Sequence, residues 1–120
     1  MSRISDELRA RTKAYASAII RFYVQLPKRR EEIRILGNQL LRSGTSVAAH
    51  VREAARARSV AEFISKLDGG IQEADESDLW LTLLRDDCGI RNDDVAPLLG
   101  ETDELISIFT TMINRSKGNS

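Results

Sequence analysis

The chain has little cysteine, few aromatic residues and no long apolar run. Its single cysteine, Cys88, excludes an internal disulfide and is typical of a reducing compartment. Aromatic residues make up 5% of the 120 positions, so the core has to rest on Leu, Ile, Val and Ala, which favours packed helices over a β-sandwich. The first residues lack the apolar segment of a secretory signal, and no apolar run has the length of a membrane span. These absences predict a soluble cytoplasmic protein with no membrane partner, folded as one domain over residues 1–120.

The charges are equal in number but unevenly distributed. Residues 1–66 carry 14 Lys and Arg against 6 Asp and Glu, a net charge of +8, whereas residues 67–120 carry 4 against 12, a net charge of −8. The basic half either meets the phosphates of nucleic acid or meets the acidic half, within the protomer or on a neighbouring copy. The composition leaves both interpretations open.

Apolar residues recur at steps of three and four along four segments, which predicts an all-α protein with no sheet. Leu26-Pro27 ends the first segment, because the residue before a proline is pushed out of helical conformation. Ser59 and Glu62 form a capping box at the start of the third segment, and Gly89 follows its end. The predicted helices span roughly residues 5–25, 28–57, 59–88 and 94–116.

The same repeats predict which faces are buried. The expected core positions of the second helix are Ile33, Leu36, Leu40, Gly44, Val47, Val51 and Ala54. Those of the third helix are Val60, Phe63, Leu67, Ile71, Ala74, Leu81, Leu84 and Cys88. The Asn92-Asp93-Asp94 cluster is expected to cap the fourth helix, with Pro97 in its first turn. Asp68-Gly69-Gly70 lies inside the third helix and indicates either a tight helix crossing or a flexible point.

Two motifs stand in the middle of the chain. The first comprises Arg42, Ser46, Val47, His50, Val51, Glu53 and Ala54, followed by Ser59, Glu62 and Phe63. The second is Gln72-Glu73-Ala74-Asp75-Glu76-Ser77-Asp78-Leu79-Trp80-Leu81. They resemble motifs of the 23S rRNA-intervening sequence protein family, which has an Arg-x-x-x-Ser-[Ile/Val]-x-x-Asn-[Ile/Val]-x-Glu-[Gly/Ala] helix followed by a Ser-x-x-[Glu/Asp]-Phe start. One branch of that family carries Lys-Glu-Ala-x-Glu-[Ser/Thr]-x-x-Trp-Leu in the second motif. His50 stands where the family usually has asparagine.

The resemblance implies an up-down-up-down four-helix bundle that assembles as a ring-shaped homo-oligomer, with a pentamer favoured. A relative of the family, the accessory protein of diversity-generating retroelements, is a pentameric barrel that engages its reverse transcriptase and nucleic acid. The partners that the resemblance implies are therefore further copies of the chain, RNA or DNA, and a reverse transcriptase or other protein.

No residue pattern indicates catalysis or a bound cofactor. A di-iron bundle needs Glu-x-x-His on two helices, and this chain has one histidine, His50, in the opposite order His50-x-x-Glu53. Cys88 lies near a helix C-terminus, which disfavours a thiolate, and no Gly-rich phosphate loop occurs. The sequence predicts a protein that is not an enzyme, with no catalytic residue, metal or cofactor.

Polar residues of the second and third helices form one candidate set. Arg42, Ser46, His50 and Glu53 share a side of the second helix, since they are spaced by four and three. Glu73 and Glu76 are the expected opposite charges for Arg42 or Arg52. A structural or interface role for these residues is favoured over a ligand or nucleic-acid role.

Basic residues at the two ends of the second helix form the other candidate set. The expected nucleic-acid-binding residues are Lys28, Arg29, Arg30, Arg34, Arg56 and Arg58. Contacts to phosphate from such residues are independent of sequence and sensitive to salt. Two hypotheses follow: a ring-forming adaptor whose basic surface binds nucleic acid or a nucleic-acid enzyme, and an interaction scaffold whose basic and acidic halves complement each other between subunits. The discriminating feature is whether the residues around Lys28 to Arg34 face solvent.

Overall fold

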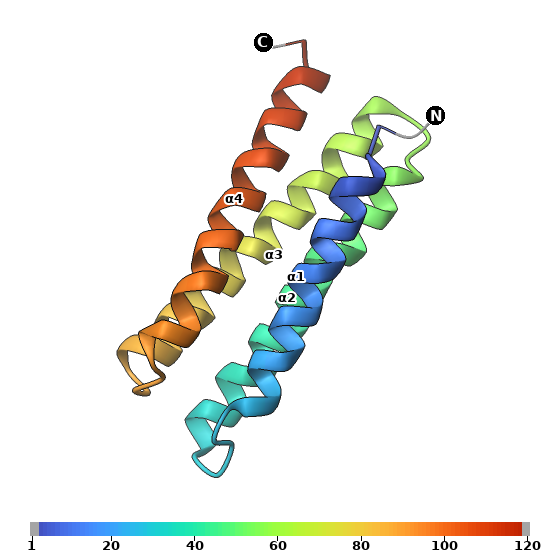
Figure 1. Ribbon diagram of the computed structural model, residues 1–120. Coiled ribbons are helices and arrows are strands. Elements are labelled where there is room, and N and C mark those ends of the chain that lie inside the picture. Colours follow the sequence, from blue (N-terminus) through green and yellow to red (C-terminus); the bar gives the residue numbers. More distant parts are fainter. Residues whose placement is uncertain (1–2, 119–120) are drawn as a thin grey trace.

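A computed structural model of the chain describes residues 3–118. These residues form four helices and no strand: α1 (Asp6–Gln25), α2 (Glu31–Ala55), α3 (Val60–Asp86) and α4 (Asn92–Ser116). Successive helices run in opposite directions and give an elongated bundle with extents of 47 × 22 × 20 Å (Figure 1). The all-α prediction is therefore confirmed. The ends of the predicted domain, residues 1–2 and 119–120, lie outside the described residues.

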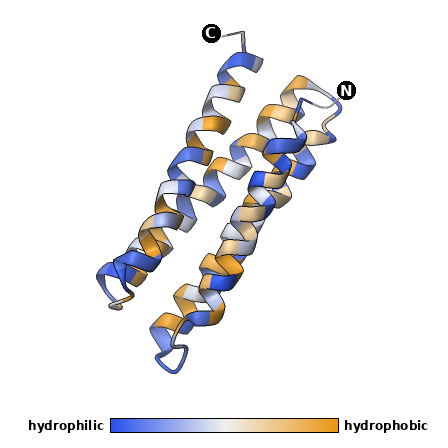
Figure 2. Cartoon of the chain, viewed as in Figure 1, coloured by the Kyte–Doolittle hydropathy of each residue, from blue (hydrophilic) through white to orange (hydrophobic). Residues whose placement is uncertain are grey.

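The core follows the predicted apolar repeats. The expected positions of α2 and α3 are buried or half-buried, with one exception. Val60 was predicted to face the core but is 42% exposed, because it is the first residue of α3 and precedes the region where α4 covers that helix. Hydrophilic and hydrophobic residues alternate along the helices, and the tip of the α1–α2 turn is hydrophilic (Figure 2).

Several helix boundaries differ from the prediction by two or three residues. α2 and α3 each end two residues earlier than predicted, at Ala55 and Asp86, and the starts of α2 and α4 also differ. Residues 28–30 form a turn instead of the start of α2, because the Lys28 ammonium folds back onto the carbonyl oxygens of Tyr23, Val24 and Leu26 at 2.8–3.4 Å. α4 begins at Asn92, so that residue and the two aspartates after it occupy the first turn and do not cap it. Pro97 consequently lies in the second turn, not the first.

Glycine in α2 lets α1 approach closely. A Cβ atom at Gly44 would lie 2.8 Å from Ile19 Cγ1 and 2.9 Å from Ile19 Cγ2, distances that packed carbon atoms do not adopt. Ile19 is fully buried at this crossing. Gly44 therefore serves packing, as the sequence favoured.

A polar layer with one side chain from each helix crosses the centre of the bundle. Tyr15 Oη (α1) and Thr102 Oγ1 (α4) are 2.7 Å apart, and Ser43 Oγ (α2) and Ser77 Oγ (α3) are also 2.7 Å apart. All four residues are at most 2% exposed. Thr102 donates its proton to the Leu98 carbonyl oxygen, so the Tyr15 hydroxyl donates to Thr102. Burial raises the pKa of Tyr15, and hydrogen bonds with Thr102 and Ser77 oppose part of that increase.

An ion pair joins α1 to α4 one turn from this layer. Arg11 Nε and Nη2 donate to the two carboxylate oxygens of Glu101, each at 2.8 Å. This bidentate geometry is the strongest form of an arginine–carboxylate contact. The hydrogen bonds from Arg11 lower the pKa of Glu101.

Replacing Tyr15 with phenylalanine is expected to lower the free energy of unfolding by about 1 kcal/mol, because a buried hydrogen bond is lost while Thr102 keeps its bond to Leu98. Urea denaturation measures this change. The matched control is Tyr23→Phe, whose hydroxyl bonds Asn38 at the surface and whose loss is expected to change stability by less than about 0.5 kcal/mol. Equal losses of stability at both positions would show that the buried Tyr15–Thr102 bond stabilises the fold no more than the surface Tyr23–Asn38 bond.

The Arg11–Glu101 pair predicts a specific sensitivity to acid. Because the folded state lowers the pKa of Glu101 below its ordinary value of 4.5, the stabilisation is present above that pH and is lost as the pH falls through the folded-state value. Glu101→Gln should therefore flatten the decline in melting temperature below about pH 5. Glu104→Gln, an exposed change on the same helix, is the control and should leave the wild-type acid profile intact.

Candidate functional site

The turn between α1 and α2 uses most of its basic residues internally. Lys28 caps the C-terminus of α1 and lies 4.6 Å from the centre of the Tyr23 ring. Arg30 binds the Glu32 carboxylate at 2.7 Å and the Cys88 carbonyl oxygen at 2.9 Å, which ties this turn to the end of α3. Arg34 pairs with Glu31 at 3.4 Å.

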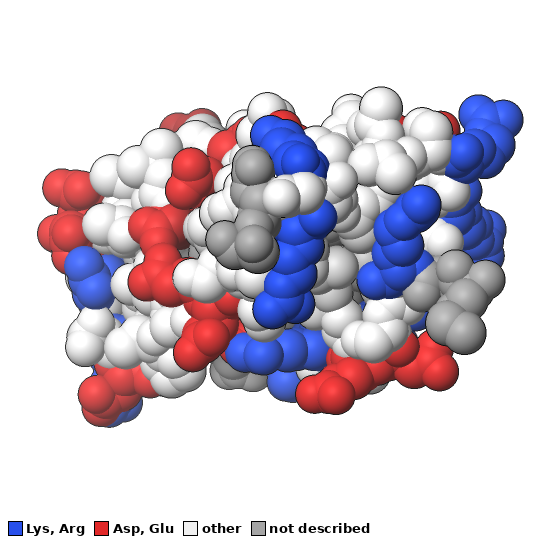
Figure 3. Space-filling view, turned by 90° about the horizontal axis from the view of Figure 1, so that it is seen from above, with Lys and Arg blue, Asp and Glu red and all other residues white. Residues whose placement is uncertain are grey.

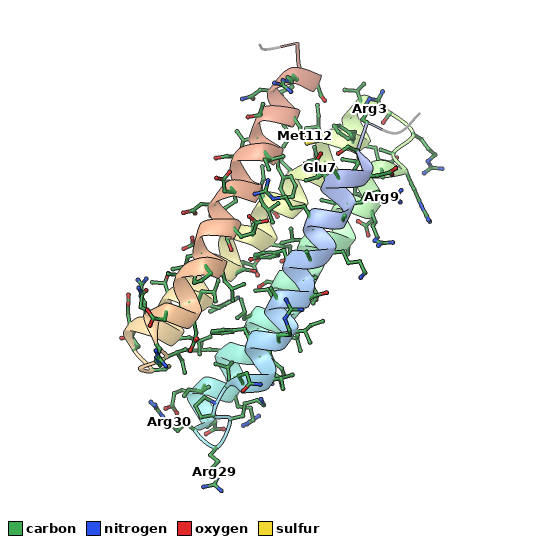
Figure 4. All side chains as sticks on the ribbon, in the orientation of Figure 1. Arg3, Glu7, Arg9, Arg29, Arg30 and Met112 are labelled. Carbon is green, nitrogen blue, oxygen red and sulfur yellow. The ribbon has the colours of Figure 1, made fainter. Side chains whose placement is uncertain are left out.

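The other three predicted residues, Arg29, Arg56 and Arg58, are more accessible to an external ligand. Arg29 projects from the tip of the α1–α2 turn (Figure 4) and has no hydrogen-bond or ion-pair partner within residues 3–118. Arg56 and Arg58 lie at the opposite end of α2, where Arg58 is 90% exposed and meets Glu62 only at 3.8 Å. The six predicted nucleic-acid-binding residues therefore form two groups at opposite ends of the bundle, and do not form one surface.

A different basic surface lies along the outer seam of α1 and α2. The Tyr23 hydroxyl donates to Asn38 at 2.8 Å, which places positions 23 and 38 side by side on this seam. Arg9 precedes Tyr23 by two heptads and Arg52 follows Asn38 by two heptads. In an antiparallel pair both steps lead toward the same end of the bundle, so Arg9 and Arg52 are neighbours.

Lys13 and Arg56 extend this group by one helical turn on each helix. Arg9, which points away from α4 in Figure 4, is half-buried, and the other three side chains are exposed. We call Arg9, Lys13, Arg52 and Arg56 the basic edge. No carboxylate of the described residues lies within ion-pair distance of any of the four. Sequence reasoning did not group these four residues, because their grouping depends on the register between α1 and α2. The heptad spacing of Arg9, Ala16 and Tyr23 places these three residues on one face of α1, and that was the available signal.

Several residues of the predicted polar set meet at the contact between α2 and α3. Arg42 donates to Glu73 at 3.3 Å and to Glu76 at 2.8 Å, and Glu73 is only 14% exposed. Ser46 bonds the Arg42 carbonyl oxygen within its own helix at 2.7 Å. Arg52 does not join these residues, because it lies on the side of α2 that faces α1.

His50 and Gly69 occupy one site between the same two helices. A Cβ atom at Gly69 would lie 2.6 Å from His50 Cε1 and 2.8 Å from Nδ1, so the imidazole ring fills the space that glycine leaves. His50 Nδ1 is buried, lies 3.5 Å from Glu53, and has no hydrogen-bond partner in the described range. Glu53 in turn pairs with Lys66 of α3 at 3.4 Å. The histidine and the double glycine are thus parts of one close crossing, and α3 stays helical through it.

A hollow of about 650 Å³ opens between the C-terminal end of α1 and the N-terminal end of α4, beside the α3–α4 turn. Phe22, Leu26 and Leu98 contribute apolar surface to it, while Arg21 and Asp94 stand among its polar lining residues. The hollow combines both charge signs and holds no buried polar group without a partner, since the buried unpaired atoms of the described residues belong to His50 and Trp80.

The fold and the polar surface together define the class of the protein. It is an all-α bundle of four antiparallel helices whose polar surface is organised into charged seams. No three His, Cys, Asp or Glu side chains of residues 3–118 are grouped to hold a metal ion, and no helix in that range is long and apolar enough to cross a bilayer. Cys88 is buried at the end of α3.

The chain belongs to the 23S rRNA-intervening sequence protein family, whose model matches residues 7–111. It is similar to a solved structure from Bacteroides thetaiotaomicron, described as a protein of unknown function from the S23 ribosomal protein family. The two chains are 31% identical, the match covers 88% of this chain and 94% of the other, and the TM-score is 0.81. None of the curated proteins compared with the chain matches it.

The crossing of His50 over Gly69 predicts a reversal of sign in a double-mutant cycle. Gly69→Ala is expected to lower the free energy of unfolding by about 1–2 kcal/mol in the natural chain, because its Cβ meets the imidazole ring. In a His50→Ala background the same change should raise stability by about 0.5–1 kcal/mol, since alanine is the better helix former.

Gly100→Ala is the matched control, because nothing lies within 4 Å of its added Cβ. It should raise stability by about 0.5–1 kcal/mol in both backgrounds. If Gly69→Ala behaves in the same way in both, the ring moves aside freely and the two residues are not coupled.

Proposed function

We propose that the protein is a non-enzymatic cytoplasmic adaptor, assembled from several copies as a ring in which a pentamer is favoured, that binds nucleic acid through the basic edge. A nucleic-acid enzyme such as a reverse transcriptase is the protein partner that suits this role. The observation that carries the proposal is the basic edge itself: Arg9, Lys13, Arg52 and Arg56 share one seam without a carboxylate to neutralise them.

Phosphate is the anion that best suits this surface. Four like charges on adjacent turns repel one another, and an external polyanion removes that repulsion by matching their spacing along the seam. The basic edge contains no aromatic side chain, so stacking on unpaired bases contributes little. Contacts from such a surface are made to the backbone and are insensitive to base sequence.

A second candidate function is an oligomeric interaction scaffold whose basic and acidic halves complement each other between subunits, with no role in nucleic-acid binding. The observation that favours it is that most basic residues of the α1–α2 turn are already paired within the chain. Lys28, Arg30 and Arg34 are held by groups of the same chain, so that turn offers phosphate mainly Arg29.

Fluorescence anisotropy with labelled 20-base-pair duplex DNA and RNA, at about 50 and about 200 mM salt, tests the proposal. Replacing the four basic-edge residues with glutamine is expected to weaken binding on the order of 100-fold and to make log Kd less dependent on log salt. The comparison variant replaces Lys28, Arg29, Arg30 and Arg34 with glutamine, which removes the same charge.

The comparison variant should keep most of the affinity. If it loses affinity while the basic-edge variant does not, nucleic acid binds at the turn, as the sequence alone suggested. If the natural protein binds neither duplex at about 50 mM salt, the adaptor role fails and the scaffold role is favoured.

A further inference from the structure

The hollow between α1 and α4 has its border fixed by contacts of the two adjoining turns. Arg30 of the α1–α2 turn donates to the Cys88 carbonyl oxygen at 2.9 Å and ties that turn to the end of α3. Gly89 then takes a φ of 77°, which a residue with a Cβ rarely adopts, and the Ile90 N–H donates to the Leu84 carbonyl oxygen at 3.0 Å. The chain thus follows a fixed path beside the hollow, so a ligand would not have to order it.

The buried part of the lining is apolar. Leu26 and Leu98 line the hollow at 6% and 8% exposure, and Phe22 beside them is half-buried. Pro27 and Ile90 add apolar surface from the two turns. The volume of about 650 Å³ lies within the range of about 300 to about 1,000 Å³ that is usual for sites of small organic ligands. The hollow is therefore large enough for a small molecule with apolar groups.

The rim of the hollow carries two charges that no group of the described chain neutralises. Arg21 on the α1 wall and Asp94 on the α4 wall line the hollow and are exposed. Neither side chain has an ion-pair partner among residues 3–118, and the two are too far apart to pair with each other. The other charged residues of the lining, Arg91 and Asp93, pair with each other at 3.1 Å. The hollow therefore offers an external ligand one cation and one carboxylate on opposite walls.

This placement of opposite charges follows the charge separation of the whole bundle. Seen from above, acidic side chains predominate on one side of the molecule and basic side chains on the other (Figure 3). α1 belongs to the half of the chain with a net charge of +8 and α4 to the half with −8, so the hollow between them has walls of opposite sign. A ligand with one kind of charge would be attracted to one wall and repelled by the other, whereas a zwitterion is attracted to both.

We infer that the hollow binds a short peptide with apolar side chains and free termini. The peptide carboxylate meets Arg21, its ammonium meets Asp94, and its side chains cover Phe22 and Leu98. A peptide fits this arrangement because its opposite charges stand at its two ends with apolar groups between them. A single amino acid does not, since its two charged groups are bonded to one carbon atom whereas Arg21 and Asp94 do not reach each other. The site is independent of the proposed function, because neither charged residue belongs to the basic edge.

An NMR titration of the backbone amide signals with the tripeptide Leu-Phe-Leu tests the site. The free tripeptide is expected to bind with a Kd on the order of 1 mM and to shift the signals of Phe22, Ile90 and Leu98. Amidation of its carboxylate or acetylation of its ammonium should each weaken binding about fivefold, because each removes one charge pair. In Arg21→Gln the amidated and free peptides should bind alike, and in Asp94→Asn the acetylated and free peptides should bind alike.

The matched control replaces Lys13 and Asp103, exposed charges of the same two helices outside the hollow, with glutamine and asparagine, and should keep both differences between peptides. Because all of these variants change exposed side chains, their melting temperatures should stay within about 3 °C of the natural protein. The proposal is overturned if the free tripeptide shifts no signal at about 5 mM, if the shifted signals lie away from the hollow, or if the blocked peptides bind as tightly as the free one. Loss of both differences in the control shows a general effect of charge and overturns it as well.

Discussion

The buried layer of Tyr15, Ser43, Ser77 and Thr102 fixes the geometry on which the surface depends. Apolar faces alone permit neighbouring helices to slide by a turn, since Leu, Ile and Val positions are nearly interchangeable. The Tyr15 hydroxyl has no such freedom, because a slide would take it away from Thr102 at a cost of about 1–3 kcal/mol. Ser43, Ser77 and Thr102 would keep bonds to carbonyl oxygens of their own helices but would lose their partners on the facing helix. Each pair in the layer joins two different helices, and the Arg11–Glu101 pair extends the α1–α4 junction to the surface. The layer therefore favours one register between α1 and α4 and one between α2 and α3.

The register between neighbouring helices decides which charges become neighbours on the surface. Arg9 and Arg52 are far apart in the chain and share a seam only because α1 and α2 meet at Gly44 and at the Tyr23–Asn38 bond. A shift of one turn would move Arg9 away from Arg52 and would also remove the space that Ile19 fills. The same dependence holds for Asp78 and Asp103 across α3 and α4. Features of the surface are thus consequences of small side chains and hydroxyls in the interior.

The parts of this protein that could be predicted from sequence are those encoded within one helix. The core stripes of α2 and α3 follow from local spacing, and Arg42 with Glu73 and Glu76 follows from opposite charges on adjoining helices. The predictions for the burial of Val60 and for the start of α2 were wrong, because both positions lie at helix ends. There a capping residue or a folded-back lysine outweighs the apolar periodicity. The basic edge and the fit of His50 over Gly69 were missed as units, since each depends on the register between two helices. The sequence contained the unusual histidine and the unusual glycines but not their contact.

The separation of charge between the two helical hairpins leaves the basic edge without compensation inside one protomer. A mixed distribution would let each cation meet a carboxylate on its own protomer, as Arg42 and Arg11 do. Cations on one edge and carboxylates on the other gain nothing from each other across the bundle and raise repulsion within each edge. In the proposed function nucleic acid supplies the missing opposite charge, because its phosphates remove the repulsion among Arg9, Lys13, Arg52 and Arg56.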